Sequence, residues 1–219
     1  MRVHSIFTSI DGEVNKWGQG TFSTFLRLAG CGLACTYCDT PQARDWDGKK
    51  VFTLSEVINE INKRGCKKVT ITGGEPLMQQ DALFNLLRYL LFRHPYDKRD
   101  FKVSIETNGS IPIPEWGGGI NWIADYKLPS SGMSEQMDLE NFENLGSDDY
   151  IKMVVEDKND FYFALGVIDA LKEKRISARI AMSPLDPTLP PGVLMGWLMK
   201  EKMFDIQLNV QLHKLLGIE

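Results

Sequence analysis

Three of the four cysteines in this 219-residue chain stand close together, in the segment Cys31-Gly-Leu-Ala-Cys35-Thr-Tyr-Cys38. Cysteine thiolates are ligands for zinc and for iron–sulfur clusters. A tetrahedral zinc site closes with four ligands, whereas this segment offers three thiols and no histidine. Three thiolates around a four-iron cluster would leave one iron open to another ligand. The three thiols alone leave both kinds of site open, and we expect Cys66 to be an ordinary small core residue.

The cysteines directly follow a segment with the pattern of a β-strand, and similar segments recur along the chain. Alternating apolar residues predict strands at 3–7, 22–28, 67–72, 101–107, 120–126, 150–155, 178–183 and 204–210. Apolar residues at helical spacing predict helices at 53–65, 81–93, 160–174 and 192–200. In the first helix, Thr53 and Glu56 have the spacing of a capping box, and Gly65 ends it.

This alternation of strands and helices predicts an α/β fold with right-handed crossovers and a mostly parallel sheet. A closed eight-stranded barrel typically needs about 250 residues. The Pro- and Gly-rich segment 110–119 also leaves no room for a crossover helix. We therefore expect one domain, 1–219, that forms an open, partial TIM-like barrel of about six mostly parallel strands with fewer helices. The carboxyl ends of such strands carry the active site, which is where the cysteines lie.

Composition and charge exclude several classes of protein. No apolar run approaches the roughly 20 residues that span a bilayer, so we expect no membrane partner. The first residues lack the apolar core of a secretory signal, which predicts a cytoplasmic protein. The 25 basic and 29 acidic residues give a net charge of −4, which argues against nucleic acid as a partner.

Two sequence motifs together resemble the radical S-adenosylmethionine (SAM) superfamily. The first is the Cys-x3-Cys-x2-Cys segment with Tyr37 before its last cysteine, and the second is Thr72-Gly-Gly-Glu-Pro76 after the next long strand. In such enzymes the Gly-Gly edge offers backbone groups to the amino group of SAM, which a residue without a Cβ allows. The alternative is that Gly73-Gly74 forms a plain strand-to-helix turn.

Further blocks are similar to the 7-carboxy-7-deazaguanine synthase family, and they run from residue 9 to residue 214. They are Asp11-Gly-Glu13, residues 21–31, Cys38-Asp-Thr40, Glu106-Thr-Asn-Gly109, residues 127–132 and Gln211-Leu-His-Lys214. One departure is Asp11, because the family usually has Gln at that position. The resemblance implies a lyase of queuosine and 7-deazapurine biosynthesis. It would convert 6-carboxy-5,6,7,8-tetrahydropterin to 7-carboxy-7-deazaguanine with loss of ammonia.

The same resemblance implies the cofactors and the residues around them. A [4Fe-4S] cluster on Cys31, Cys35 and Cys38 would cleave SAM to a 5′-deoxyadenosyl radical, so we expect no dedicated acid or base. The resemblance places Mg²⁺ at Thr40, whose hydroxyl is a hard oxygen ligand. It places the substrate at Ile10, Asp11, Gly12, Glu13, Arg27, Thr72 and His213. It places SAM at Tyr37, Gly74, Glu106, Lys127 and Ser131.

Several of these residues also have ordinary structural interpretations. Arg27 could bind the substrate carboxylate with two parallel hydrogen bonds, or it could form a salt bridge at a strand edge. Glu13 could accept from the pterin N–H groups, or it could be a solvated acid in a turn. Thr40 could hold the metal, or it could only cap its own turn.

We expect three partners: a small pterin substrate, an electron donor such as flavodoxin or ferredoxin, and a second copy of the chain in a homodimer. One alternative is an activase that makes a glycyl radical on a partner enzyme, which can share both motifs. Another is a non-enzymatic zinc- or iron–sulfur-binding module.

Overall fold

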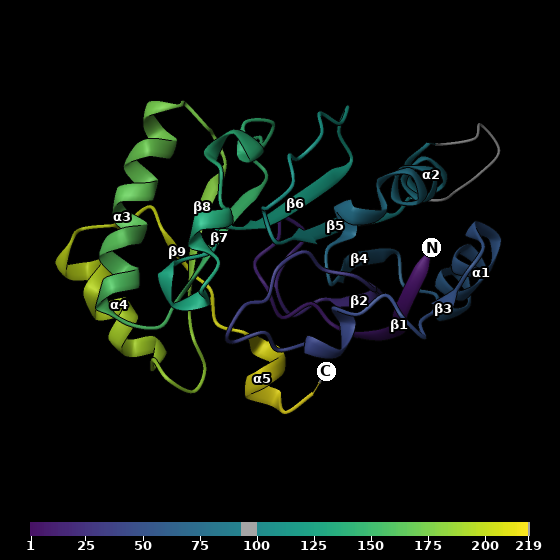
Figure 1. Cartoon of the computed structure of the whole chain (residues 1–219), viewed down its shortest axis with the longest axis horizontal. Helices are drawn as coiled ribbons and strands as arrows, with labels where there is room; N and C mark the ends of the chain where they lie inside the picture. Colours follow the sequence, from purple (N-terminus) through teal and green to yellow (C-terminus); the bar gives the residue numbers. More distant parts are fainter. Residues whose placement is uncertain (93–99, 219) are drawn as a thin grey trace.

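A single sheet organises the computed structural model, which describes residues 1–92 and 100–218 (Figure 1). Its strand order is β3-β1-β2-β4-β5-β6-β7-β8-β9. The strands are β1 (Arg2–Ile10), β2 (Phe22–Leu28), β3 (Lys50–Val51), β4 (Lys68–Gly73), β5 (Lys102–Thr107), β6 (Ile120–Asp125), β7 (Tyr150–Val155), β8 (Arg179–Pro184) and β9 (Gln207–Leu208). From β2 to β9 neighbouring strands are parallel, whereas β1 is antiparallel to both β2 and β3.

Five α-helices accompany the sheet within the described residues. They are α1 (Leu54–Arg64), α2 (Gln80–Leu91), α3 (Lys158–Glu173), α4 (Pro191–Lys200) and α5 (Leu212–Leu216). Figure 1 shows α1 and α2 beside the half of the sheet that contains β1 and β4, and α3 and α4 beside β7 to β9. Short 3-10 turns, among them η1 (Pro41–Ala43), η2 (Pro76–Gln79) and η3 (Pro129–Ser131), follow the carboxyl ends of strands.

The two faces of the sheet differ in chemistry because strand residues alternate between them. On one face Leu26, Ile71 and Ile105 are fully buried in the main hydrophobic core, which also contains Val57 of α1 and Leu83 of α2. The intervening residues point to the opposite face, where they line a pocket with polar and charged side chains. The helices thus cover the apolar face of the sheet, and the pocket lies on the opposite face.

The expected open, mostly parallel sheet is confirmed, but the expected number of about six strands is too low. Eight of the strands fall on the segments predicted as strands, and the two-residue β3 is the one that falls on none of them. The segment 204–210, expected as a strand, pairs with β8 only at Gln207 and Leu208, and Phe204 at its start is exposed. Helix α5 is too short to show a periodic pattern. The predicted helix end at Arg93 lies outside the described residues.

The residues predicted to begin and end α1 do so in the structure. Thr53 is the N-cap, its side chain accepts from the Glu56 amide, and the Glu56 carboxylate accepts from the Thr53 amide. Gly65 ends the helix with a left-handed conformation. No helix among residues 1–92 and 100–218 is long and apolar enough to cross a membrane.

Candidate active site

A pocket of about 210 Å³ opens at the carboxyl edge of the parallel strands. Its lining contains residues from every part of the chain. Of the predicted site residues, it includes Ile10, Asp11, Gly12, Glu13, Arg27, Cys31, Cys35, Tyr37, Cys38, Thr72, Gly74, Glu106, Lys127 and His213. Thr40 and Ser131 are the two predicted residues that the lining does not contain. The structure therefore brings the thiols and the predicted substrate residues to one cavity.

The cysteine loop (residues 29–40) is held in place by backbone contacts on both sides. The Gly30 amide donates to the Ala43 carbonyl at 2.8 Å, and the Thr36 amide donates to the Ser131 carbonyl at 3.1 Å. The Thr36 hydroxyl donates to the Ser130 carbonyl at 2.7 Å. The three thiols are unpaired and partly accessible. These hydrogen bonds hold the loop in place, so the three thiols face the pocket without having to stabilise the loop themselves.

Gly73 and Gly74 lie against the cysteine loop, and the backbone there leaves no space for a side chain. A Cβ on Gly73 would come 2.1 Å from the Leu28 carbonyl oxygen, and one on Gly74 would come 2.1 Å from that of Gly30. The Gly74 amide donates to the Leu28 carbonyl at 3.0 Å, and the Glu75 amide donates to that of Gly30 at 2.7 Å. The two glycines thus join β4 to the cysteine loop, which is more than a plain turn requires.

Glu75 connects this junction to the next strand, a role that sequence reasoning missed. Its fully buried carboxylate accepts from the Leu77 amide at 2.8 Å, the Thr107 hydroxyl at 2.9 Å and the Asn108 amide at 2.7 Å. Burial raises the pKa of Glu75, while these three bonds favour its charged form. The Asn108 side chain in turn donates to the Cys31 sulfur at 3.4 Å. The Thr72–Pro76 and Glu106–Gly109 motifs therefore act as one structural unit behind the thiols.

One side of the pocket combines Tyr37, Lys127 and Asp125. The Tyr37 hydroxyl is buried and has no hydrogen-bond partner among the described residues. The Lys127 ammonium lies 2.7 Å from Asp125 Oδ2. Burial alone would lower the pKa of Lys127, but Asp125 raises it above the ordinary value. Burial raises the pKa of the Cys35 thiol, whereas Lys127 favours its thiolate.

Ser131 does not join this side of the pocket. Its hydroxyl is fully buried in the turn that supports the cysteine loop, where it donates to the Leu128 carbonyl at 2.6 Å and accepts from the Met133 amide at 3.0 Å. The hydroxyl therefore serves the turn, and this position gives no support to the expected contact with SAM.

Arg27 lies on the opposite side, in a half-buried position at the end of β2. It forms no salt bridge with any described residue, so the strand-edge alternative finds no support. Its guanidinium donates to the Thr40 hydroxyl at 2.8 Å and lies 5.8 Å from the centre of the Phe7 ring. Phe7 and Phe25 stack at 5.1 Å with their planes 7° apart. These two rings, which sequence reasoning missed, give the pocket a flat apolar wall.

Thr40 lies behind Arg27. Its hydroxyl donates to Asp39 Oδ1 at 3.0 Å while it accepts from Arg27. It forms no cap of the following turn η1, so the local-cap interpretation is wrong. Two hard oxygens are therefore adjacent, as Mg²⁺ prefers. A cation at this oxygen would be repelled by the guanidinium, which donates to it from 2.8 Å.

Glu13 is buried rather than solvated, so the interpretation as a surface acid in a turn is wrong. Its carboxylate accepts from the Asn209 amide group and from Gln211 Nε2 at 2.6 Å. Lys152 of β7 lies 3.2 Å from Glu13 Oε2 and 3.3 Å from Asp125 Oδ1. Sequence reasoning missed Lys152, although a lysine inside an apolar strand was a visible signal.

Asp11, the residue that departs from the family pattern, faces Lys68 rather than open space. Its Oδ2 lies 3.0 Å from Lys68 Nζ and accepts from the Thr70 hydroxyl at 2.9 Å. Burial lowers the pKa of Lys68, and Asp11 opposes that effect. The ion pair anchors the β1–β2 loop to β4, so Lys68 supplies a partner suited to a carboxylate at position 11.

His213 closes the pocket from the carboxyl-terminal side. A Cβ on Gly12 would come 2.2 Å from His213 Nδ1, and the Leu212 amide donates to the Gly12 carbonyl at 3.2 Å. Burial lowers the pKa of His213, and Glu13 opposes this. In Figure 1 helix α5 lies near β1 and β2, although it is more than 180 residues later in the sequence. The absence of a side chain at position 12 lets the two segments meet.

Glu106, the next-to-last residue of β5, lines the same pocket as the predicted substrate residues. Burial and the neighbouring carboxylate of Asp11 raise its pKa to about 7, with a smaller contribution from Glu13. Lys152 and a hydrogen bond from Thr72 oppose this shift. Glu106 is thus held between its neutral and charged forms near neutral pH.

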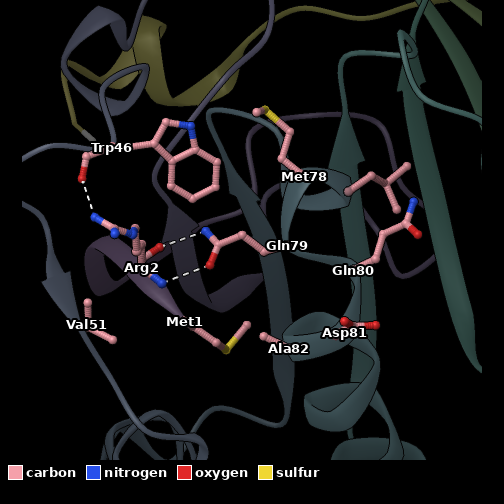
Figure 2. A pocket seen from close by; sticks show the side chains of 10 residues that line it. Met1, Arg2, Trp46, Val51, Met78, Gln79, Gln80, Asp81 and Ala82 are labelled. Carbon is pink, nitrogen blue, oxygen red and sulfur yellow. Dashed lines mark hydrogen bonds between the residues drawn. The ribbon is translucent and has the colours of Figure 1, made fainter.

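A wider, shallower hollow lies outside the site (Figure 2). There the Arg2 backbone amide donates to Gln79 Oε1 at 2.8 Å, and Gln79 Nε2 donates to the Arg2 carbonyl at 2.9 Å. The Arg2 guanidinium donates to the Trp46 carbonyl at 3.0 Å. None of the predicted site residues lines it. The polar groups of Arg2 and Gln79 are thus already hydrogen-bonded within the hollow.

The four cysteines lie in two separate regions of the structure. Cys66 lies half-buried between α1 and β4, outside the pocket, so its assignment to the core is wrong. Within residues 1–92 and 100–218, no three His, Cys, Asp or Glu side chains are arranged to hold a single metal ion. The three loop thiols suit a cluster, because each ligand binds a different iron.

Comparison with known proteins gives consistent matches. The Radical SAM superfamily model matches residues 26–124. A Clostridium acetobutylicum protein named 7-carboxy-7-deazaguanine synthase is 36% identical, over 96% of this chain and 93% of its own. A Methanospirillum hungatei protein of the same name is 37% identical, over 100% of this chain and 86% of its own.

A third relative and a solved structure extend these matches. A protein of that name from Leptospira interrogans is 32% identical over 97% of this chain and 93% of its own. The solved structure, native anSMEcpe with bound AdoMet and Kp18Cys peptide, matches with a TM-score of 0.50 and 17% identity. It covers 88% of this chain, which spans 65% of that structure's length. This likeness concerns the fold.

Proposed function

The chain belongs to the 7-carboxy-7-deazaguanine synthase family, and we propose that it converts 6-carboxy-5,6,7,8-tetrahydropterin to 7-carboxy-7-deazaguanine with loss of ammonia. The observation that carries this proposal is the single pocket that holds three free thiols on one side and Arg27, Glu13 and His213 on the other. A reaction between a cluster-bound cofactor and a small carboxylated substrate requires both sides to face one cavity.

The residues on the thiol side fit the cofactors that the family implies. Cys31, Cys35 and Cys38 would hold a [4Fe-4S] cluster, and the partnerless Tyr37 hydroxyl and the Lys127 ammonium are available to SAM. When bound, the reduced cluster and SAM supply the radical that removes a hydrogen atom from the substrate. Lys127 would pair with the SAM carboxylate, and the Asn108 amide would donate to the sulfur of Cys31.

The other side suits a flat, polar, carboxylated molecule. Phe7 and Phe25 offer a face to the pterin ring, and Arg27 offers a planar fork to its carboxylate. The Glu13 carboxylate would accept from pterin N–H groups, since Asn209 and Gln211 already fix its orientation. Thr72 and His213 complete the contacts that we propose.

Mg²⁺ would bind at the Thr40 hydroxyl beside Asp39. Because Arg27 donates to the same hydroxyl, metal and guanidinium compete for one oxygen. Movement of Arg27 to the substrate carboxylate would release it. The metal would then bind beside the carboxylate and offset its charge.

The remaining partners follow from the same chemistry. The reaction needs a reductant, for which we propose flavodoxin or ferredoxin in the cytoplasm. We further propose that the single domain of this chain pairs as a homodimer. Size-exclusion chromatography with light scattering would test the dimer, and reduction of the cluster by each purified donor would test the electron source.

Anaerobic turnover tests the function directly. Reconstituted protein is incubated with SAM, dithionite, Mg²⁺ and the carboxypterin, and the products are identified by mass spectrometry. We expect 7-carboxy-7-deazaguanine and ammonia from the parent, and neither from the Cys35→Ala variant. SAM cleavage that leaves the carboxypterin unchanged would refute the substrate assignment. A glycyl radical formed on an added partner enzyme would favour an activase, which the relatives' names do not support.

A further inference from the structure

Four side chains of alternating charge run along one wall of the pocket. In order they are Lys127, Asp125, Lys152 and Glu13, which we call the charge row. The three ion-pair distances along it are 2.7, 3.3 and 3.2 Å. It begins beside Tyr37 on the thiol side and ends at Glu13, next to Gln211. The row therefore crosses the pocket from the cofactor side to the substrate side.

Burial makes each member depend on its neighbours. Lys127, Lys152 and Glu13 are buried, and each has at most about a tenth of its side chain exposed. Burial alone would raise the pKa of Asp125, but Lys127 and Lys152 lower it below the ordinary value. Burial would lower the pKa of Lys152, but Asp125, Glu13 and Glu106 raise it well above that value. The opposite charges of Lys127, Asp125 and Lys152 thus stabilise one another, and a change at one end alters the balance at the next member.

The two carboxylate oxygens of Asp125 differ in their hydrogen bonding. Its Oδ2 accepts a short hydrogen bond from Lys127 at 2.7 Å. Its Oδ1 is buried and has no hydrogen bond of good geometry from any described residue, and the Lys152 ammonium lies 3.3 Å away. Asp125 therefore has an unused acceptor facing Lys152, and Lys152 divides its charge between Asp125 and Glu13.

We propose that Asp125 is a positioning residue that couples the binding of SAM to the binding of the pterin. This inference rests on the proposed function, because it takes the ligands of Lys127 and Glu13 from there. A carboxylate that pairs with Lys127 weakens the bond from Lys127 to Asp125. Asp125 then draws Lys152 toward Oδ1, and Glu13 Oε2 is released to accept from the pterin.

The direction of the coupling follows from this order. Each ligand releases the residue that the other needs, so each should raise the affinity for the other. Thermodynamic linkage requires the two effects to be equal. A coupling of about fivefold or more is typical when one site reorganises another. Without a negative charge at position 125, the two lysines lose their common partner and the coupling should fall to about one.

Calorimetry of the holoenzyme without reductant tests this, because neither ligand then reacts. The dissociation constant of SAM is measured with and without saturating carboxypterin, and their ratio is the coupling factor. We expect about fivefold or more for the parent, and about one for Asp125→Asn and for Lys152→Met. Lys174→Met removes an exposed ion pair with Glu143, outside the pocket, and should retain the parental ratio.

The ratio separates coupling from damage to the fold, since general damage would weaken both affinities and leave the ratio unchanged. Lys152→Met provides the measurement if Asp125→Asn does not fold. Parental coupling in the variant that folds would overturn the inference, as would independent binding of the two ligands to the parent. A parent that binds no carboxypterin at any SAM concentration would overturn the proposed function, and this inference with it.

Discussion

The buried carboxyl of Glu106 should make the protein less stable as the pH rises, and Glu106→Gln should remove that loss. The pKa of Glu106 is raised to about 7 from an ordinary value of 4.5, first by burial and then by Asp11. A raised pKa means that the folded state binds the proton more tightly than the unfolded state does. Stability is therefore lost as the pH rises above the unfolded value, and the loss is complete once the pH exceeds the folded value.

The magnitude follows from linkage. One pKa unit corresponds to about 1.4 kcal/mol. The cost of Glu106 is under about 1 kcal/mol at pH 5 and about 3 kcal/mol at pH 8. Glutamine has the same shape, is neutral throughout, and can still accept from Thr72. The free energy of unfolding of Glu106→Gln, relative to the parent, should thus rise by about 2 kcal/mol between the two pH values.

Urea unfolding of the iron-free protein at pH 5 and pH 8 measures this difference. Groups that do not interact with Glu106 titrate equally in both proteins and cancel. The exposed Glu115 provides a matched control, and Glu115→Gln should show no comparable change with pH. A constant difference between Glu106→Gln and the parent would mean that Glu106 is charged at both pH values, and the electrostatic account of the pocket would be wrong.

Four further predictions concern the site directly. Alanine at any of the three loop cysteines should abolish iron binding and SAM cleavage, whereas Cys66→Ala should retain both; equal loss of iron from all four would indicate a four-cysteine site. Arg27→Lys should keep the iron but weaken carboxypterin binding about tenfold or more, because the fork is lost, and an unchanged affinity would place the carboxylate elsewhere. Thr40→Ala should still cleave SAM but need more Mg²⁺ for product, and parental turnover that is indifferent to chelator would remove the metal. Gly74→Ala should lose iron, because its Cβ would clash with the cysteine-loop backbone, whereas Gly32→Ala has open space and should retain it.

Much of the fold could be predicted because its signals are local. The Thr53 capping box and Gly65 mark both ends of α1, and alternating apolar residues mark the long strands. The two-residue strand β3 exists only because it pairs with β1, and β9 is the part of the predicted segment 204–210 that pairs with β8. No period can be recognised in two residues, so the sequence does not reveal β3.

The candidate site divides in the same way. The three thiols lie within one short segment of the sequence, and the glycine motif lies within another. The strand order brings these two segments to one edge of the sheet. Asp125, Lys152 and Asn209 acquire their importance through partners 27 to 196 residues away, which no local pattern reveals. A charge inside an apolar strand was the available signal for Lys152. It indicates that a residue faces something other than the core, but not which residue it meets.

The charges of the pocket explain why Glu106 in particular is poised near neutral pH. Asp11 pairs with Lys68, Asp125 pairs with Lys127 and Lys152, and Glu13 pairs with Lys152, so each of these three acids has a lysine within 3.3 Å. Glu106 has no ion pair with any described residue, and the carboxylates of Asp11 and Glu13 raise its pKa. A buried charge that lacks a partner is costly, so this acid takes up the proton. A bound ligand that brings positive charge or N–H donors near Glu106 would stabilise its charged form, and the unpaired acid is then part of what the pocket offers to its ligands.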